Sequence, residues 1–269
     1  MSAFTTHFSF SFKTGIRNKN LLLMNYLFPL GFFMMMGFIM PEINPLFRET
    51  MVPAMVTFAV LAATLLGLPD LLVSARESGI FRSYKINGVP ASSILLIPGL
   101  TTGLHLAIVL LIIIFTAPIL FGANVPGHSL HFFVTLAALS LACTGIGILI
   151  GVVSSSTRLT VLYSQVIFVP SMLLGGLMLP FSMLPEAAHP FAQLLPATHA
   201  VNAFNGLAMD ASADFNPWAS IIMLSASGLI AFLLALYLFS WDSKNSKRRG
   251  HPALALLVLA PYFAGILLL

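Results

Sequence analysis

The run at residues 93–120 reads SILLIPGLTTGLHLAIVLLIIIFTAPIL, and His105 is the only ionisable side chain in it. A helix that crosses the hydrocarbon core of a bilayer needs about 20 predominantly apolar residues, so this run is long enough to span. Five more apolar runs lie at about 21–40, 53–73, 132–153, 160–180 and 218–241. We therefore expect an all-α polytopic membrane protein with six spans.

The composition supports this class. The chain of 269 residues is 58% hydrophobic and only 7% charged, whereas a soluble domain carries about 25% charged residues. The formal net charge of +4 does not indicate nucleic acid as a partner, because basic residues in membrane proteins mainly set topology. Cys143 is the only cysteine, which excludes a disulfide within the chain and leaves a thiolate metal site unsupported.

The basic residues orient the predicted spans. Of the 12 Lys and Arg residues, only Arg48 falls on the opposite side of the predicted membrane from the N-terminus. The positive-inside rule then places the N-terminus in the cytoplasm. The prediction is a multi-pass protein of the plasma or inner membrane, with lipids around most of its surface.

The N-terminal segment, residues 1–20, has its own pattern. Phe4, Phe8 and Phe12 follow one another at intervals of four, which is typical of one face of a helix. This pattern favours an interfacial helix on the cytoplasmic leaflet. A disordered tail is the alternative.

The C-terminal segment, residues 253–269, is apolar and contains Pro261 near its middle. A seventh span, a re-entrant hairpin and an interfacial helix all fit its length and composition. We divide the chain into a transmembrane domain, 1–241, and a basic turn followed by this hydrophobic segment, 242–269.

The longest connection on the predicted outer side is 181–217. It consists of short apolar pieces separated by Pro185, Pro190 and Pro196. Such pieces indicate re-entrant helices that dip into the outer leaflet, where irregular backbone must be buried in protein or line a cavity. A loop lying on the lipid headgroups is the alternative.

A polar interruption between the second and third runs, residues 77–90, reads ESGIFRSYKINGVP. A helix over 74–87 would gather four side chains on one face and two basic ones toward the other: Glu77, Ile80, Phe81 and Tyr84, against Arg82 and Lys85. Gly88 and Pro90 would end it. Either lipid or another protein covers the apolar face, or the segment is a surface loop whose charges only enforce topology.

Two motifs, in this order and spacing, resemble the ATP-binding-cassette type-2 exporter permease family over about 1–241. The first consists of Arg76-Glu77-Ser78-Gly79, then Arg82, Gly88-Val89-Pro90 and Pro90-Ala91-Ser92. The second consists of Gly175-Gly176, Pro180, Met183-Leu184-Pro185 and Leu195-Pro196-Ala197-Thr198-His199-Ala200-Val201. The sequence departs from the family pattern at Ile80, where Thr is frequent, and at His199, where Tyr is common.

The resemblance implies a six-span exporter half that forms the translocation pathway with a second half, identical or different, and is driven by a separate ABC ATPase. The sequence has no G-x-x-x-x-G-K-[ST] loop, so we expect no enzyme activity and no directly bound cofactor. ATP and Mg would be used by the partner ATPase. We expect a hydrophobic or amphipathic cargo such as a drug, an antibiotic or a lipid, and hence a role such as multidrug efflux.

The resemblance also assigns candidate residues. The cytoplasmic coupling helix would comprise Arg76, Glu77, Gly79, Ile80, Phe81, Arg82, Tyr84, Lys85 and Pro90. Its apolar side chains would enter a groove on the ATPase, Glu77 would position the helix or pair with Arg82, and Arg76 and Lys85 would meet an acidic rim or lipid phosphates. The outer re-entrant region would comprise Pro180, Pro185, Pro196, Thr198 and His199.

An ATP-independent secondary transporter or channel is the alternative function. Such proteins place several charged groups at mid-membrane, whereas these runs hold little beyond His105. His105 either lines a pathway or hydrogen-bonds a neighbouring helix.

Three further motifs favour structural interpretations. His128 and His131 lack a third metal ligand, so no metal site is expected. The run 225–228, Ser-Ala-Ser-Gly, indicates helix packing better than a protease. Gly147 and Gly151 indicate close helix contact, within the chain or with a partner half.

Overall fold

The computed structural model describes residues 8–9, 12–13, 17–242 and 250–268, and all secondary structure in these ranges is helical. Within these ranges, six helices are long and apolar enough to cross a membrane, which confirms the six predicted spans. In order they are η1–α3 (Leu23–Leu27, Phe28–Ile43), α4–η2–α5 (Phe47–Leu61, Ala62–Gly67, Leu68–Glu77), α7 (Ala91–Phe121), α8 (Ser129–Val153), α9 (Thr157–Leu174) and α12 (Pro217–Leu238). The short helix α2 (Lys19–Leu22) precedes η1.

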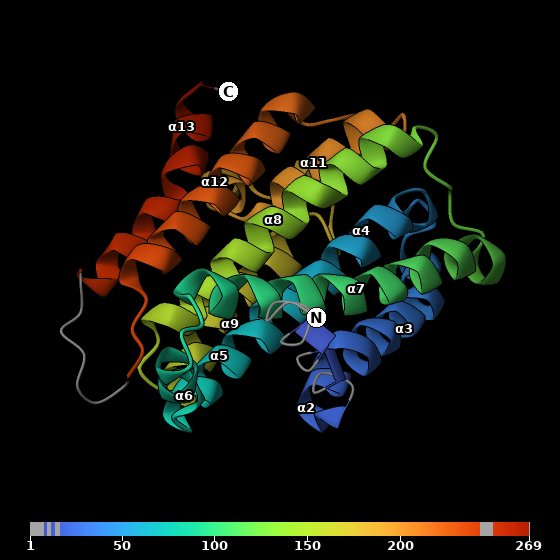
Figure 1. Cartoon of the computed structure of the whole chain (residues 1–269). Coiled ribbons are helices and arrows are strands. Elements are labelled where there is room, and N and C mark those ends of the chain that lie inside the picture. Colours follow the sequence, from blue (N-terminus) through green and yellow to red (C-terminus); the bar gives the residue numbers. More distant parts are fainter. Residues whose placement is uncertain (1–7, 10–11, 14–16, 243–249, 269) are drawn as a thin grey trace.

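The second span, α4–η2–α5, forms the centre of the bundle. Its apolar side chains from Met51 to Leu65 are at most 1% exposed. It packs on α3 and α7 on one side and on α8 on the other (Figure 1). The remaining spans leave large apolar side chains such as Phe38, Phe115 and Val166 exposed, as helices facing hydrocarbon do.

Small residues allow α8 to pack closely on its neighbours. A Cβ at Gly145 would lie 2.6 Å from the carbonyl oxygen of Gly228 in α12, and one at Gly147 would collide with the Thr64 carbonyl. A Cβ at Gly151 would meet Leu72. The glycines of α8 and the Ser-Ala-Ser-Gly run therefore serve packing within the chain, through backbone approach between apolar helices.

The bundle has two ends, named here after the short helices that mark them. The α6 end carries α6 (Ile80–Ile86), the turn between α8 and α9, and the residues after α12. The α11 end carries α11 (Pro196–Ala208) and the connection between α7 and α8 (Figure 1).

The connection between α9 and α12 lies at the α11 end and packs against the bundle. Its pieces are η3 (Phe181–Met183), η4 (Glu186–Ala188), α10 (His189–Gln193) and α11. Ala197, Ala200 and Phe204 of α11 are fully buried against α4, α8 and α12. This burial contradicts the alternative of a loop lying free on the surface. The preceding span ends at Leu174, earlier than expected, because the chain turns at Gly175 and at Gly176, whose φ is +80°.

The C-terminal segment runs as η5 (Pro252–Leu259) and α13 (Ala260–Leu268) beside α12, from the α6 end toward the α11 end (Figure 1). Ser227 Oγ donates to Val258 O at 3.2 Å. The segment does not turn back within residues 250–268, so the hairpin interpretation is wrong. The segment has 8 residues of 3₁₀-helix and 9 of α-helix. Because a 3₁₀-helix rises about 2.0 Å per residue, the length of the segment is roughly 30 Å, which is close to the thickness of the hydrocarbon core of a bilayer.

Most of the N-terminal segment, including Phe4, lies outside the described residues, so the interfacial helix stays a prediction. Residues 243–249 of the basic turn also lie outside them.

Candidate functional site: the α6 end and the α11 end

Two left-handed glycines delimit α6. The expected single helix over 74–87 is instead two helices, because α5 ends at Glu77 and Gly79 has φ +78°. Gly88, with φ +71°, follows α6, and Pro90 directly precedes α7. Glycine adopts this backbone conformation without the steric cost that a Cβ brings. The break turns α6 relative to α5 and presents it at the end of the bundle.

Arg76 is buried in the protein. Its side chain is 7% exposed, its Nη1 donates to Val152 O at 2.9 Å, and its Nη2 donates to Ser154 O. These carbonyls lie at the C-terminus of α8, where a cation is favoured. The expected contact of Arg76 with an acidic rim or lipid phosphates is therefore wrong, because its guanidinium caps α8.

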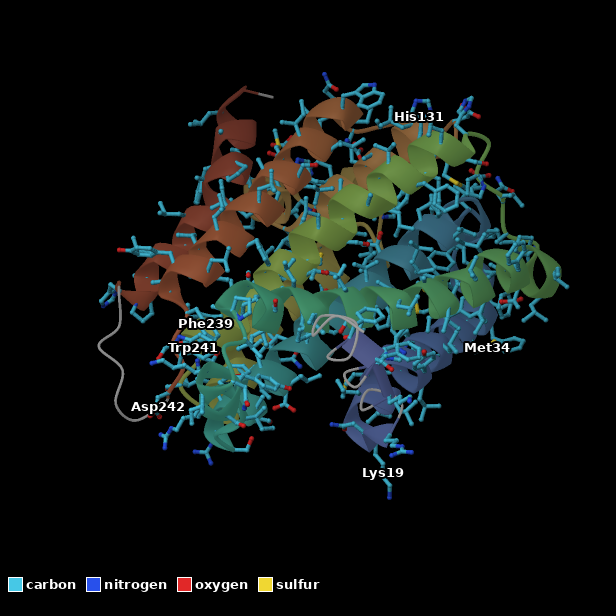
Figure 2. All side chains as sticks on the ribbon, in the orientation of Figure 1. Lys19, Met34, His131, Phe239, Trp241 and Asp242 are labelled. Carbon is cyan, nitrogen blue, oxygen red and sulfur yellow. The ribbon has the colours of Figure 1, made fainter. Side chains whose placement is uncertain are left out.

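Phe81 also faces inward. It is 4% exposed, and its ring lies 5.6 Å from that of Phe239, which in turn contacts Trp241 at 5.1 Å. These residues directly follow α12 and lie beside α6 (Figure 2). The expectation that Phe81 enters a groove on a partner is wrong for this structure, because its own chain covers the ring.

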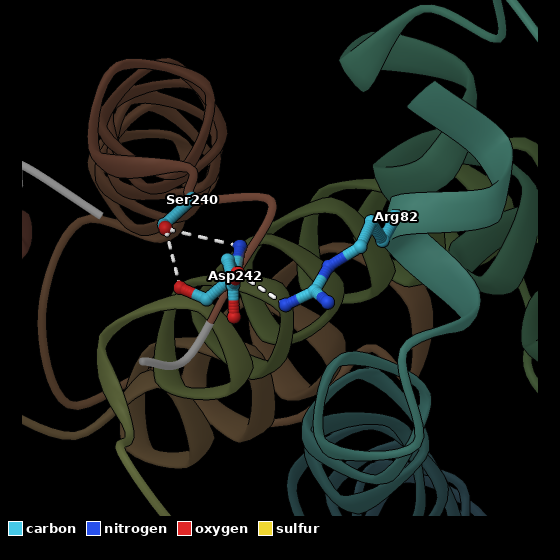
Figure 3. Close-up of polar contacts among 3 residues, drawn as sticks. All are labelled: Arg82, Ser240 and Asp242. Carbon is cyan, nitrogen blue, oxygen red and sulfur yellow. Dashed lines mark hydrogen bonds and ion pairs between the residues drawn. The ribbon is translucent and has the colours of Figure 1, made fainter. Parts of the chain in front are cut away.

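Arg82 pairs with Asp242, and Asp242 also hydrogen-bonds Ser240 (Figure 3). A pair of Glu77 with Arg82 was one of the two roles expected of Glu77. The structure instead connects α6 to the residues after the sixth span. Phe239 and Asp242 were missed in the sequence because nothing local links them to α6.

The exposed surface of α6 is mixed, with two apolar side chains among polar and charged ones. Ile80 is 44% exposed and Ile86 is 81% exposed, and Glu77 and Lys85 are exposed beside them. Tyr84 is half-buried, and this burial raises the pKa of its phenol above the ordinary value. Ile86 was missed because the expected apolar face ended at Tyr84.

At the α11 end, Asn202 is the centre of a buried hydrogen-bond network. Its Oδ1 accepts from the backbone N–H of Asp214 at 2.8 Å and of Phe215 at 3.2 Å. Its Nδ2 donates to Phe215 O at 2.9 Å and to Ser220 Oγ at 3.2 Å. All four hydrogen-bonding positions of the amide are thus used.

The side chain of Asp214 lies close to this network. Desolvation by burial raises the pKa of its carboxyl group, and the nearby His189 lowers that pKa by a smaller amount.

The residues predicted for the outer re-entrant region lie around this hydrogen-bond network or in the short helices that lead to it. His199 Nε2 donates to Gln193 O at 2.7 Å, so its Nδ1 accepts from Ser220 Oγ at 3.4 Å. Thr198 Oγ1 donates to Ala192 O at 2.6 Å. Pro180 and Pro185 precede the two short 3₁₀-helices, and Pro196 begins α11. Burial lowers the pKa of His199 to about 4, so the imidazole is neutral near pH 7.

His105 and His128 both contact residues far from them in the sequence. His105 is 2% exposed, the Tyr26 hydroxyl lies 2.8 Å from its Nδ1, and Phe12 stacks on its ring. This enclosure favours the helix-bridging interpretation of His105. His128 pairs with Asp210 at 3.0 Å. Among the described residues, no three His, Cys, Asp or Glu side chains gather as a metal site.

The structure therefore brings the coupling candidates together at one end and the outer candidates together at the other.

The ABC-2 type transporter family profile matches residues 2–208, which include both groups. A search of curated proteins found no match. The matched range covers more than half of the chain. The chain therefore belongs to the ABC-2 type transporter family, as a membrane permease domain that acts as a transport subunit.

Proposed function

We propose that this chain is the permease half of an ATP-driven exporter and that α6 is where a separate ATPase docks. Membership of the family implies partnership with an ABC ATPase. The observation that carries the proposal is the geometry of α6: a short helix that projects from one end of the bundle while its inner face is anchored to distant parts of the chain.

The exposed side of α6 suits a helix-in-groove contact. Ile80 and Ile86 supply apolar area, and Glu77 and Lys85 supply charges of both signs at its border. The phenyl ring of Phe81 does not contribute, because it is buried. Docking therefore depends on Ile80, with Tyr84 one turn along the same face and Ile86 at the end of the helix.

The inner side of α6 supports a mechanical role. Phe81 contacts Phe239, and Arg82 pairs with Asp242, both after α12. Arg76 at the end of α5 holds the C-terminus of α8. A displacement of α6 by ATP-driven closure of the ATPases would thus reach the second, fourth and sixth spans together, as a rigid-body switch.

The charge distribution supports a cytoplasmic α6 end. Arg76, Arg82, Lys85 and Arg158 lie at that end, and Glu186, Asp210 and Asp214 lie at the other. The positive-inside rule then places the N-terminus in the cytoplasm and α11 in the outer half of the membrane. The burial of α11 fits a re-entrant element at that depth.

A second permease half, identical or different, would complete the pathway. The cargo proposed is hydrophobic or amphipathic, such as a drug, an antibiotic or a lipid, because the spans offer few charges to a polar solute. His105 is enclosed by its own chain, which removes the main candidate for ion coupling and disfavours an ATP-independent transporter.

The test is affinity purification of the tagged chain in mild detergent, with identification of co-purifying proteins and assay of vanadate-sensitive ATPase activity. We expect an ABC ATPase to co-purify with the unmodified chain. Ile80→Asp should remove it, because the charge would be buried in the docking groove. Ile43→Asp, at the other end of the bundle and 71% exposed, is the matched control and should retain it. Uphill transport by the purified chain without an ATPase would overturn the proposal.

A further inference from the structure

An apolar cavity of about 750 Å³ lies between α9 and the C-terminal segment. Residues of α8, including Ile150, form its inner wall, and Leu195 and Pro196 line it where α10 meets α11. Tyr163, Tyr262 and His251 are the lining side chains with polar groups, and the other lining side chains are apolar. The wall contributed by the C-terminal segment lies beyond residue 208, outside the family match.

Different helices hold the two long walls apart. α9 packs on η2 and α5, whereas η5 and α13 pack on α12. Ser227 bonds Val258, and a Cβ at Gly265 would collide with Met223, so the C-terminal segment lies tightly on α12. The ring of Tyr262 stacks on His199 with centroids 5.0 Å apart. The two long walls therefore rest mainly on different helices, and α8 and α10 contact both of them.

The cavity is elongated along the spans and open on one side. Its lining in α9 extends from Tyr163 to Leu174, which corresponds to roughly 16 Å of helix. Val166 is 70% exposed, and Leu256 is 67% exposed. His251 lies at the α6 end of the cavity, and the opening lies along apolar side chains at the depth of the spans.

The medium around this opening decides what fills it. An unfilled cavity of this size forfeits the contacts of its lining atoms. Ordered water needs polar partners, which this lining lacks over most of its length. Hydrocarbon chains are the abundant material at this depth of a bilayer.

We propose that the cavity binds an acyl chain of a membrane phospholipid, from the leaflet at the α6 end, with its headgroup beside His251. The bound chain fills the space between α9 and the C-terminal segment and makes the lipid part of the packed protein. This proposal does not depend on ATPase docking, because the cavity and α6 share no lining residue.

The experiment uses vesicles of phosphatidylethanolamine and phosphatidylglycerol that contain a trace of phospholipid with a photoreactive group at the end of one acyl chain. After illumination, labelled peptides of the full chain are mapped. We expect labels concentrated on residues 163–174 and 252–262. Labels spread evenly over all lipid-facing helices, including α3, would overturn the proposal.

A matched pair of variants tests the position. Ala253 and Ala255 line the cavity, whereas Ala260, on the same segment, does not. Ala253→Phe combined with Ala255→Phe should fill the space and lower labelling roughly tenfold, because the displaced methylenes lose their buried contacts. Ala260→Phe should label as the unmodified chain does. Equal loss in both variants would overturn the proposal.

Two further measurements separate the lipid from other occupants. Native mass spectrometry of the detergent-purified chain should show a retained phospholipid mass, which the double Phe variant loses. A retained compound of another class would overturn the assignment. One chain carries Val166→Cys, a second chain carries Leu256→Cys, and both carry Cys143→Ala. When the two are produced together, we expect no disulfide between them. Efficient cross-linking would show that a second copy occupies the site.

Discussion

The α6 end and the α11 end are stabilised by different means. At the α11 end, the amide of Asn202 uses all its hydrogen-bonding positions within a buried network. At the α6 end, an aromatic contact and an ion pair connect α6 to residues 239–242, and the Arg82 side chain is 64% exposed. Buried networks rigidify a structure, whereas exposed pairs contribute little. From this difference we propose that the α11 end is fixed and that α6 can move, as its proposed displacement by an ATPase requires.

The strongest test of this difference is Asn202→Leu. The substitution leaves the backbone N–H groups of Asp214 and Phe215 without an acceptor. Each unsatisfied buried group costs about 1–3 kcal/mol, so we expect the free energy of unfolding to fall by roughly 3–5 kcal/mol. The midpoint of thermal unfolding in detergent measures this loss.

Asn205→Leu is the matched control, because Asn205 Oδ1 is buried without a hydrogen-bond partner. We expect it to change the free energy of unfolding by less than about 1 kcal/mol. Equal losses in the two variants would remove the distinction between a fixed and a movable end.

Hydropathy predicted the six spans because the bilayer imposes their length and apolar character, and this constraint is local in sequence. The inner face of α6 was not predictable in the same way. Ile80 and Phe81 are adjacent, and which of them is buried depends on Phe239, far along the chain. Asn202 was also missed, since its partners are mostly backbone groups brought near it by the fold. The sequence alone therefore did not show which side chains are buried or which residues far apart in the chain contact each other.

The next largest effect should come from Phe81→Ala. Truncating a buried Phe costs roughly 3 kcal/mol or more, and here the loss falls on the contact between α6 and Phe239. We expect hydrogen exchange of the α6 amides in nanodiscs to accelerate by about 100-fold, which corresponds to about 2.7 kcal/mol. Export per ATP hydrolysed should fall while the ATPase still co-purifies, because the docking face is intact.

Ile86→Ala provides the comparison within the same helix. Its side chain is 81% exposed, so exchange in α6 should remain near that of the unmodified chain. Loss of ATPase co-purification in Phe81→Ala, with unchanged exchange, would show that Phe81 docks the partner and that its burial against Phe239 is not maintained.

The smallest expected effect concerns the pair of Arg82 and Asp242. Because the Arg82 side chain is 64% exposed and the Asp242 side chain is still 24% exposed, a double-mutant cycle of Arg82→Ala and Asp242→Ala should give a coupling energy of only about 0.2–1 kcal/mol, lower at high salt. Reversing one charge, as in Asp242→Arg, should accelerate exchange in α6, and adding Arg82→Asp should restore it. A coupling energy above about 3 kcal/mol would mean that the pair is desolvated in the membrane-bound protein. The α6 end would then be as fixed as the α11 end, and its movement by an ATPase would require breaking that pair.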